Sequence, residues 1–552
     1  MRFTLIIILA LTINKLAAQS TDIPLNSWAY PVLDEWDVKG EISVFSTVKP
    51  INRAYFTEIS NGVDWELSKS DKADLGYIIL ETREHQDSVP AAQKGLFNAL
   101  YKYESDFFSY SDESFDLHVN PVWLIEAGKD AEGRLDETLY QNYRGLELRG
   151  TVDKRVSFYT LLTENQARYA DYIKDMTDST LAVPYEGFWK QYGGTGVDFL
   201  RAQGYVDINA TKHIGVQLGY GKHFIGDGKR SLILSDIGNN YPYLRLNTKV
   251  WKIQYTNIFA QLIAQTYGGD FGLLGTGAFP KKYFANHHLS VQVTPKLTIG
   301  LFESFIQGDS TNNTNLGILN PIIFFKSIEQ QDGSGGNTIV GLDFKWNLWK
   351  QVSLYGQLAI DELVVGELLD NTGWWGNKQG FQLGGKYFDA FGLKNLDLQL
   401  ELNRVRPYLY AHESYYTNYS HYNMALAHPL GANFREILSS ISYQPIPKLK
   451  LKADLLLAKY GNDINGLSYG RDIMEPYLPD NRPGDYGNDM FQGETIDLTM
   501  VQLNAQYMLY HNLILNGTMI YREESSVTGQ SKAAQMVTFG VYWNFPVRSY
   551  LF

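Results

Sequence analysis

The chain has no cysteine among its 552 residues. This absence excludes disulfide bonds, thiolate chemistry, cysteine-type zinc sites and a lipidated N-terminal cysteine. Two catalytic or nucleotide-binding motifs are also missing. Gly228-Lys229-Arg230-Ser231 leads into apolar strand residues, whereas a Walker A loop leads into a helix, and there is no Gly-x-Ser-x-Gly elbow. We therefore expect neither an enzyme nor a cofactor.

Positive charge and long apolar runs are scarce. The net charge is −12, and loss of a leader carrying Arg2 and Lys15 would remove two positive charges and give −14, which argues against a nucleic-acid partner. No later stretch provides the ~20 apolar residues of a transmembrane helix. A membrane-embedded form of this chain must therefore be a closed barrel, because only closure satisfies every backbone group in lipid.

The first residues have the layout of a signal peptide. Arg2 supplies the positive charge, Leu5 to Leu11 is the apolar run, and Ala17-Ala18-Gln19 offers small residues for cleavage. We expect residues 1–18 to be removed and the mature protein to be exported.

Residues 19–113 have helical periodicity. One helix is predicted near Pro50, ending at Asn61-Gly62, and a second from about Ser68 to Gln86. A third is predicted after Pro90. The apolar residues of these helices are Ile51, Ala54, Tyr55, Ile59, Leu75, Ile78, Ile79, Leu96, Phe97, Leu100 and Tyr101. Two arrangements fit: the helices pack only on one another, or they plug or cap one end of a barrel.

Residues 114–552 alternate apolar and polar side chains. Leu396 to Leu402 alternates strictly, and Val501, Leu503, Ala505 and Tyr507 alternate with amide residues. This period of two predicts β-strands, but a soluble sandwich alternates as well.

Three features favour a transmembrane barrel over a soluble all-β protein. Roughly 18 segments have about ten residues each, the length of a tilted membrane-spanning strand. Short turns alternate with long polar loops, the longest near 164–196, 307–336, 362–378, 405–433 and 459–495. Aromatic residues recur at strand ends, as in an interfacial girdle, namely Trp251, Tyr255, Trp346, Trp349, Tyr542 and Trp543. The predicted fold is an all-β transmembrane antiparallel β-barrel of about 18 strands with a small N-terminal α-helical bundle.

Metal-binding patterns are weak. His287 and His288 are adjacent and would point to opposite faces of a strand, and His412, His421 and His428 share a loop without zinc-site spacing. Gly461 to Gly466 is similar to a calcium loop but has glycine at the first ligand position, which favours a plain turn. No metal site is expected.

The clearest surface signal is a tyrosine-rich loop at 408–422. Aromatic faces beside hydroxyl and amide groups suit sugar rings or protein partners, and Trp374-Trp375 offers a second platform. The candidate residues for glycan or partner binding are Trp374, Trp375, Tyr408, Tyr410, Tyr415, Tyr416, Tyr419 and Tyr422. The alternative is that these aromatic loops pack only on each other.

The stretch from Gly219 to Arg245 is the most distinctive in the chain. Glycines free the backbone for a sharp bend, and the Ser-Leu-Ile-Leu-Ser run from Ser231 to Ser235 predicts a short strand before the turn at Asn239-Asn-Tyr-Pro242. We expect this short strand to cross the barrel wall.

Four motifs follow one another along the chain. The first is Gly226-Asp-Gly228 followed by Ser231 to Ser235 and Pro242; the others are Gly336-Asn337 to Asp343, Tyr355 to Glu362, and His428-Pro-Leu-Gly431-Ala-Asn433. Their order resembles the Wzi capsule-assembly family of the Gram-negative outer membrane, and most closely its Bacteroidota members, including gliding-motility RemB-like proteins. The family turn often reads Trp-Gly-Pro-Gly, whereas this chain has Phe224-Ile-Gly-Asp-Gly228. The motif residues expected to be structural are Gly226, Gly228, Ser231, Ser235, Pro242, Asn337, Asp343, His428 and Gly431.

The resemblance implies an 18-stranded outer-membrane barrel with periplasmic helices that holds capsular polysaccharide at the cell surface. Expected partners are outer-membrane lipid and surface polysaccharide. Two alternatives stay open: a surface component of gliding motility or accessory of an envelope machine, which would bind envelope proteins, and a diffusion porin.

Overall fold

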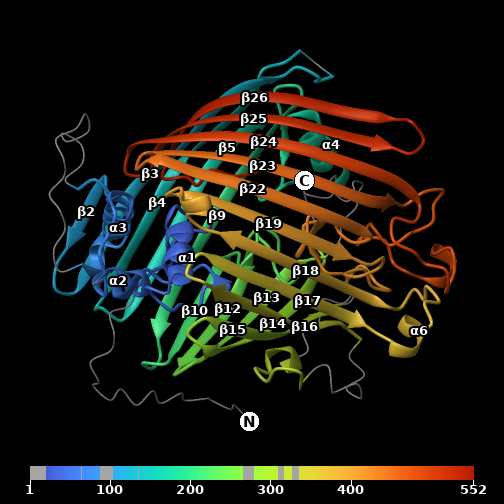
Figure 1. Cartoon of the computed structure of the whole chain (residues 1–552), viewed down its shortest axis with the longest axis horizontal. Coiled ribbons are helices and arrows are strands. Elements are labelled where there is room, and N and C mark those ends of the chain that lie inside the picture. The colour runs from blue at the N-terminus through green and yellow to red at the C-terminus, as the bar shows by residue number, and fades with distance from the viewer. Residues whose placement is uncertain are drawn as a thin grey trace, which may run out of the picture.

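A computed structural model describes residues 20–63, 65–86, 103–134, 136–264, 279–308, 316–325 and 335–552. The predicted signal peptide and the predicted helix after Pro90 lie outside these residues. Within them, 18 antiparallel strands close into one barrel, and the last strand pairs with the first through Trp543 and Trp123 (Figure 1). The predicted fold class is confirmed.

The barrel strands follow one another around the wall in chain order. They are β3 (Phe115–Asp130), β4 (Leu139–Val152), β5 (Val156–Arg168), β9 (Gly196–Asn209), β10 (Ile214–Gly221), β12 (Tyr241–Val250), β13 (Ile253–Ile263), β14 (Lys281–Thr294), β15 (Leu297–Gln307), β16 (Asn337–Leu348), β17 (Val352–Glu362), β18 (Lys378–Tyr387), β19 (Leu396–Val405), β22 (Phe434–Ile446), β23 (Leu449–Asn462), β24 (Glu494–Tyr510), β25 (Leu513–Ser526) and β26 (Ser531–Trp543).

Short pieces extend the wall or lie in the loops. The strands are β2 (Phe108–Ser111), β6 (Ala182–Val183), β7 (Gly187–Phe188), β8 (Lys190–Tyr192), β20 (Ser420–His421) and β21 (Met424–Ala425); the helices are α4 (Asp171–Thr180), α6 (Val365–Leu369) and the 3-10 turns η3 (Leu316–Leu319), η5 (Ala390–Gly392) and η6 (Pro479–Asn481). In Figure 1 α6 and neighbouring loops lie to the right, opposite the N-terminal helices. We call these ends the long-loop end and the short-turn end.

The barrel is inverted relative to a soluble protein, with apolar side chains outside and polar ones inside. Leu400 is 58% exposed, whereas its neighbours Glu401 and Asn403 are fully buried. Phe539 is 70% exposed beside the buried Thr538. Alternation of this sense, with the apolar set facing outward, is the pattern of a lipid-facing barrel wall.

Most of the predicted aromatic girdle lies on the outer face or at strand ends. Trp251 and Trp349, in short turns, are 81% and 78% exposed. The prediction for Tyr542 is wrong: this side chain is buried in the lumen, where its hydroxyl donates to Glu126 Oε2 at 2.7 Å. Tyr542 belongs to the inward set of β26, between the outward Val541 and Trp543. Among the described helices, none is long and apolar enough to cross a membrane.

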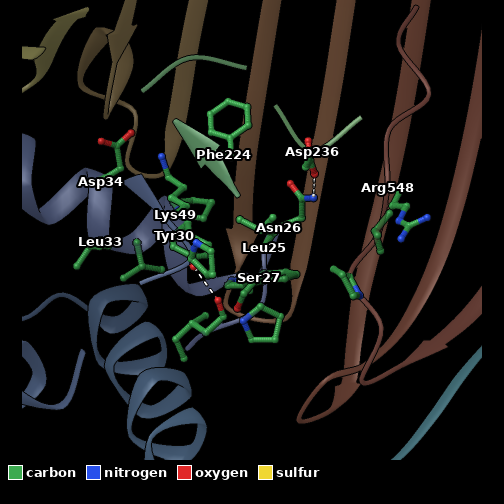
Figure 2. A pocket seen from close by; sticks show the side chains of 18 of the residues that line it. Leu25, Asn26, Ser27, Tyr30, Leu33, Asp34, Lys49, Phe224, Asp236 and Arg548 are labelled. Atoms are coloured by element: carbon green, nitrogen blue, oxygen red, sulfur yellow. Dashed lines mark hydrogen bonds between the residues drawn. The ribbon is translucent and has the colours of Figure 1, made fainter. Parts of the chain in front are cut away.

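Residues 222–240, here the inward loop, fold into the lumen between β10 and β12. The loop contains β11 (Phe224–Ile225), which pairs with β1 (Val48–Lys49) near the N-terminus, and Figure 2 shows Phe224 beside Lys49. Leu232, Ile233 and Leu234 are fully buried.

The expectation that Ser231 to Ser235 crosses the wall is therefore wrong. The segment makes a single bridge, between Ile225 and Leu234, and its Ser231 hydroxyl accepts from the Ile233 and Leu234 amides at 3.0 and 3.1 Å. A wall strand must present every second side chain to lipid, and this segment has none to present, since all five residues are buried.

The C-terminal tail, residues 544–552, also lies in the lumen. β26 ends at Trp543, three residues before Pro546, and the tail then runs inward. Arg230 of the inward loop donates to the Leu551 carbonyl, and Arg522 of β25 donates to the Phe552 carbonyl at 3.1 Å. Tyr550, Leu551 and Phe552 are buried.

The N-terminal helices lie at the short-turn end. They are α1 (Ala29–Lys39), α2 (Arg53–Asn61) and α3 (Lys69–Glu81), followed by η1 (Arg83–His85). α2 ends before Gly62, and α3 begins with a capping box in which Ser68 and Asp71 bond each other's backbone amides. α1, which has no side-chain cap, was not predicted.

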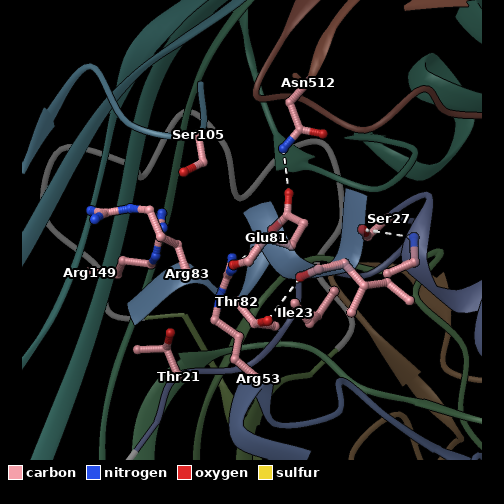
Figure 3. Close-up of polar contacts among 12 residues, drawn as sticks. Thr21, Ile23, Ser27, Arg53, Glu81, Thr82, Arg83, Ser105, Arg149 and Asn512 are labelled. Atoms are coloured by element: carbon pink, nitrogen blue, oxygen red, sulfur yellow. Dashed lines mark hydrogen bonds and ion pairs between the residues drawn. The ribbon is translucent and has the colours of Figure 1, made fainter. Parts of the chain in front are cut away.

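Polar contacts join these helices to the barrel. Ser70 Oγ donates to Asn395 Oδ1 at 3.0 Å, and Tyr77 Oη donates to Asn512 Oδ1 at 2.8 Å; both asparagines are in short turns. Figure 3 shows Glu81 between Asn512 and Arg53, whose Nη1 lies 2.9 Å from Glu81 Oε2. The helices thus cover the short-turn end of the lumen.

Candidate functional site

An aromatic cluster forms where three loops of the long-loop end meet. Trp375, from the 362–378 loop, packs edge-on to Tyr408 with ring centroids 6.1 Å apart and lies 4.9 Å from the ring of Tyr477. Trp374 is adjacent, at 6.2 Å. Tyr408 and Tyr477 are about 30 and 100 positions from Trp375 in sequence. Offset and edge-on ring contacts are favourable, so the cluster holds the three loops together.

Two cations lie against these rings. The guanidinium carbon of Arg482 lies 4.0 Å from the Trp375 centroid, and Lys378 Nζ lies 4.4 Å from that of Tyr477. Each cation also has an acid: Arg482 lies 2.5 Å from Asp485, and Lys378 lies 3.4 Å from Asp361. Cation–π contacts fix the ring orientations, and the paired charges supply hydrogen-bonding groups beside them.

His412 completes the cluster as a neutral side chain. Its ring lies 5.7 Å from that of Tyr477, and its Nδ1 lies 2.6 Å from Thr417 Oγ1. Burial, together with Lys378, lowers the pKa of His412 to about 4. At neutral pH the imidazole can therefore both donate and accept a hydrogen bond.

Around this cluster the surface is aromatic and partly open. Trp374, Trp375 and Tyr477 are half-buried, and Tyr415 and Tyr486 are 39% and 61% exposed. The Trp375 amide donates to the Asp485 carbonyl at 2.8 Å, which holds the loop carrying Tyr486 next to the tryptophan. Ring faces beside amide, carboxylate and guanidinium groups form a surface that can stack on sugar rings and bond their hydroxyls.

Three of the predicted surface tyrosines point inward. Tyr408, Tyr410 and Tyr419 are at most 2% exposed. The Tyr410 hydroxyl donates to the Leu232 carbonyl at 2.8 Å, and that of Tyr419 donates to the Ile233 carbonyl at 2.6 Å. Tyr410 and Tyr419 thus anchor the inward loop, whereas the Tyr408 hydroxyl donates to the Ser468 carbonyl at 3.0 Å. Because all three side chains are buried, they are not accessible to a large external ligand.

The remaining predicted tyrosines are at least partly accessible. Tyr416 and Tyr422 are half-buried, and Tyr422 packs edge-on to Phe188 of β7 with centroids 4.5 Å apart. Of the eight predicted residues, five are therefore partly or largely exposed: Trp374, Trp375, Tyr415, Tyr416 and Tyr422. Their role in binding stays a prediction.

Two of the family-motif residues, Gly228 and His428, belong to one polar network inside the lumen, although they are far apart in sequence. Gly228 of the inward loop lies against the wall so closely that a β-carbon there would be 2.3 Å from Glu401 Oε2. The backbone amides of Lys229 and Arg230 donate to the same carboxylate at 2.8 and 3.1 Å. Glycine at 228 thus permits the contact between inward loop and wall.

His428 enters the same network. Its Nε2 lies 3.0 Å from Glu436 Oε2, and Glu436 is also paired with Arg230. These charged hydrogen bonds join the inward loop to β22 and to the 405–433 loop. Gly431, three residues on, has a φ of 73°, and a β-carbon there would lie 2.6 Å from the Arg471 carbonyl oxygen.

The other motif residues are spread along the wall and loops. Ser235 Oγ donates to the Ala427 carbonyl, and its amide donates to the Leu426 carbonyl at 2.7 Å. Asp343 is paired with His288 at 2.6 Å. Asn337 is buried at the start of β16. Gly226 lies in the first part of the inward loop, and Pro242 lies in β12, just after the loop ends.

Functional candidates that the sequence did not reveal are Tyr477, Lys378, Arg482 and Arg230. Arg230 lies within the glycine motif, so its place there was the available signal. The other three stand in ordinary loop or strand-end sequence. Among the described residues no group of three or more His, Asp or Glu side chains could hold a metal ion.

One family model matches most of the chain. The model of the family described as capsule assembly protein Wzi matches residues 130–537. The solved structure of Wzi from Escherichia coli, described as an outer membrane protein involved in group 1 capsule assembly and a carbohydrate-binding β-barrel, is 14% identical with a TM-score of 0.59. The match covers 96% of this chain and 100% of that one. At this identity the structural match shows the fold.

Two other solved structures are less similar. OprD from Pseudomonas aeruginosa is 12% identical with a TM-score of 0.41 and covers 77% of this chain and 94% of its own. OccAB2 from Acinetobacter baumannii is 9% identical with a TM-score of 0.42, over 77% and 97%. No curated protein sequence matches the chain.

Proposed function

This chain belongs to the capsule assembly protein Wzi family, and we propose that it is a non-catalytic outer-membrane barrel that binds or organises surface polysaccharide at its long-loop end. Long loops of such barrels face outward and short turns face the periplasm, so the N-terminal helices would be periplasmic. Lipid on the apolar belt and polysaccharide on the loops are the two partners of this proposal.

One observation supports it above the others: the half-buried ring cluster of Trp375 and Tyr477 at the long-loop end, with Trp374 beside it. A polysaccharide is too large for a closed lumen, so it must be bound where rings are accessible and polar groups surround them. The carboxylates of Asp361 and Asp485 and the imidazole of His412 supply those polar groups.

The filled lumen favours binding over diffusion. The inward loop, the C-terminal tail and the N-terminal helices all occupy space that a porin leaves to water. As a diffusion porin the protein would conduct in planar bilayers, whereas the obstructed lumen predicts little current.

The second candidate is a surface component of gliding motility, or an accessory of an envelope machine, in a Bacteroidota organism. Tyrosine-rich loops suit protein partners as well as sugars. Loss of spreading with intact capsule in a deletion strain, or co-purification with motility or secretion proteins, would favour this role.

The test of the first candidate compares two tryptophan variants. Trp375→Ala removes the centre of the ring cluster, and Trp349→Ala removes an outward tryptophan in a short turn. Stacking on aromatic rings predicts that Trp375→Ala weakens binding to capsular polysaccharide at least about tenfold and releases capsule from cells. Trp349→Ala should retain both properties.

Glycan binding by the purified protein and capsule retention by a deletion strain complemented with each variant give the two readouts. Equal glycan binding by wild type and Trp375→Ala would remove the ring cluster from the proposal. Absence of glycan binding together with normal capsule retention in the deletion strain would reject the polysaccharide function itself.

A further inference from the structure

A cavity of about 550 Å³ lies inside the barrel, separate from the long-loop cluster. It is lined by the N-terminal segment, the inward loop, the C-terminal tail and several wall strands (Figure 2). Figure 2 shows Leu25, Asn26 and Ser27 on one side and Arg548 of the tail on another. The lining reaches the short-turn end at Asn395.

Two arginines of this cavity share one phenylalanine and one carboxylate. Arg201 of β9 and Arg548 of the tail have their guanidinium carbons 5.3 and 5.2 Å from the ring centroid of Phe545. Arg548 is hydrogen-bonded to Glu186, which lies 3.8 Å from Arg201 Nη1, beyond hydrogen-bonding distance. Glu186 therefore pairs closely with only one of the two cations.

Arg201 is left without hydrogen-bond acceptors in the described part of the chain. Its side chain is only 9% exposed, and its Nε and Nη1 atoms are buried and unbonded there. A guanidinium presents five donors, so an arginine this deeply buried is normally held by a carboxylate or several carbonyls. Arg201 lines the cavity, which is where an acceptor could be placed.

Lys222 is a third basic side chain near Glu186. Lys222 Nζ donates to the carbonyls of Tyr185, Asp236 and Gly238 at 2.7, 3.0 and 2.9 Å, and these acceptors carry no charge. Burial, with Arg548 and Arg201 nearby, lowers the pKa of Lys222 to about 7. Asp236, another acid of the cavity lining, accepts a hydrogen bond from Asn26 through its carboxylate at 3.0 Å.

Buried charge without a counter-charge is costly, because desolvation is repaid only by close pairing. An anion in the cavity would supply acceptors to Arg201 and balance the excess. Rings and amides continue the same wall: Tyr159 and Tyr205 are stacked with centroids 5.2 Å apart, and Gln203 lies between Arg201 and Tyr205 on β9. Such groups bind hydroxylated rings.

We propose that this luminal cavity binds a sugar carrying a carboxylate or phosphate group, with the anionic group on Arg201 and Arg548 and the hydroxylated ring against Tyr159, Gln203 and Tyr205. The site is distinct from the external polysaccharide surface. A uronate and a sugar phosphate share this chemistry, and the experiment separates them.

The test is calorimetric titration of the full chain in detergent micelles with glucuronate, glucose 6-phosphate, glucose and inorganic phosphate. Wild type should bind glucuronate or glucose 6-phosphate at least about tenfold more tightly than glucose, since a charge-assisted hydrogen bond contributes that much. The tighter of the two identifies the anionic group. Two results would overturn the proposal. One is equal binding of glucose and both anionic sugars; the other is binding of inorganic phosphate alone, which would show an adventitious ion only.

Variants locate the site. Arg201→Gln should weaken binding of the preferred sugar at least about tenfold, whereas Arg155→Gln, an exposed arginine in a short turn, should match wild type. Unchanged affinity in Arg201→Gln would overturn the assignment to Arg201. Heat-induced gel mobility shifts establish that each variant is folded, and the wild-type comparison of charged with neutral sugars decides the proposal even where a variant is not.

Discussion

Arg230 and Glu436 form a bidentate ion pair inside the barrel. Arg230 Nε lies 3.2 Å from both carboxylate oxygens of Glu436, and Nη2 lies 2.8 Å from Oε1. The two residues are 206 positions apart, one on the inward loop and one on β22. Asn403 and His428 both bond Oε2 of the same carboxylate, so the network joins the inward loop to the wall and to the 405–433 loop.

Glu436→Gln should loosen the inward loop. Removing one partner of a buried ion pair leaves the other charge uncompensated and costs about 3 kcal/mol. We expect a lower midpoint of heat-induced gel mobility shift and faster proteolysis within residues 222–240. Asp136→Asn, in an exposed pair with Lys129, is the matched control and should change neither readout. Equal behaviour of the two variants would show that the Arg230 pair does not hold the loop.

Gly228→Ala should have a similar effect through sterics alone. A β-carbon at 228 would lie 2.3 Å from Glu401 Oε2 and 2.8 Å from a ring carbon of Tyr355, so the loop or the carboxylate must move. Overpacking of this kind costs about 1–3 kcal/mol. Gly366→Ala, where a β-carbon meets nothing within 4 Å, is the control. Gel mobility midpoints and proteolysis compare the two; a Gly228→Ala variant as stable as Gly366→Ala would contradict the close contact.

The barrel wall could be predicted from the sequence because its information is local. The alternation at Leu400, Glu401 and Leu402 gives strand and face together, and the short turns give the direction of the chain. The sequence signal for α3 is equally local, since Ser68 and Asp71 mark the start of the helix within three residues. The alternation alone does not tell whether the apolar side faces outward or inward, and the closed barrel decides this.

The lumen could not be predicted, because its contacts join residues far apart in sequence. Ser231 to Ser235 has the local pattern of a strand, yet the hydroxyls of Tyr410 and Tyr419, each more than 170 positions away, hold it inside. The same contacts bury two tyrosines that local composition assigned to the surface. α1 lacked a side-chain cap to mark its start at Ala29.

Docking of the N-terminal helices should weaken as pH rises through the titration of Asp74. This α3 side chain is 8% exposed, and burial raises its pKa to about 6 although Lys450 opposes the shift. Between its ordinary value of 3.8 and about 6, the docked state keeps a proton that the undocked state has released. Stability therefore falls with rising pH across that window and stays lower above it.

Asp74→Asn removes this penalty, because an amide occupies the site without a charge. A shift of about two pKa units corresponds to about 2–3 kcal/mol, so the variant should be more stable than wild type by up to this amount at pH 7.5 and nearly equal to it at pH 4. Urea titrations of the full chain in micelles, monitored by the protease resistance of residues 20–86, measure the stability difference at pH 7.5 and at pH 4. Glu66→Gln, at an exposed carboxylate on the same segment, should show no such pH-dependent gain. A constant difference between Asp74→Asn and wild type from pH 4 to pH 7.5 would mean that Asp74 is charged in the docked state throughout, and that Lys450 outweighs burial at this contact.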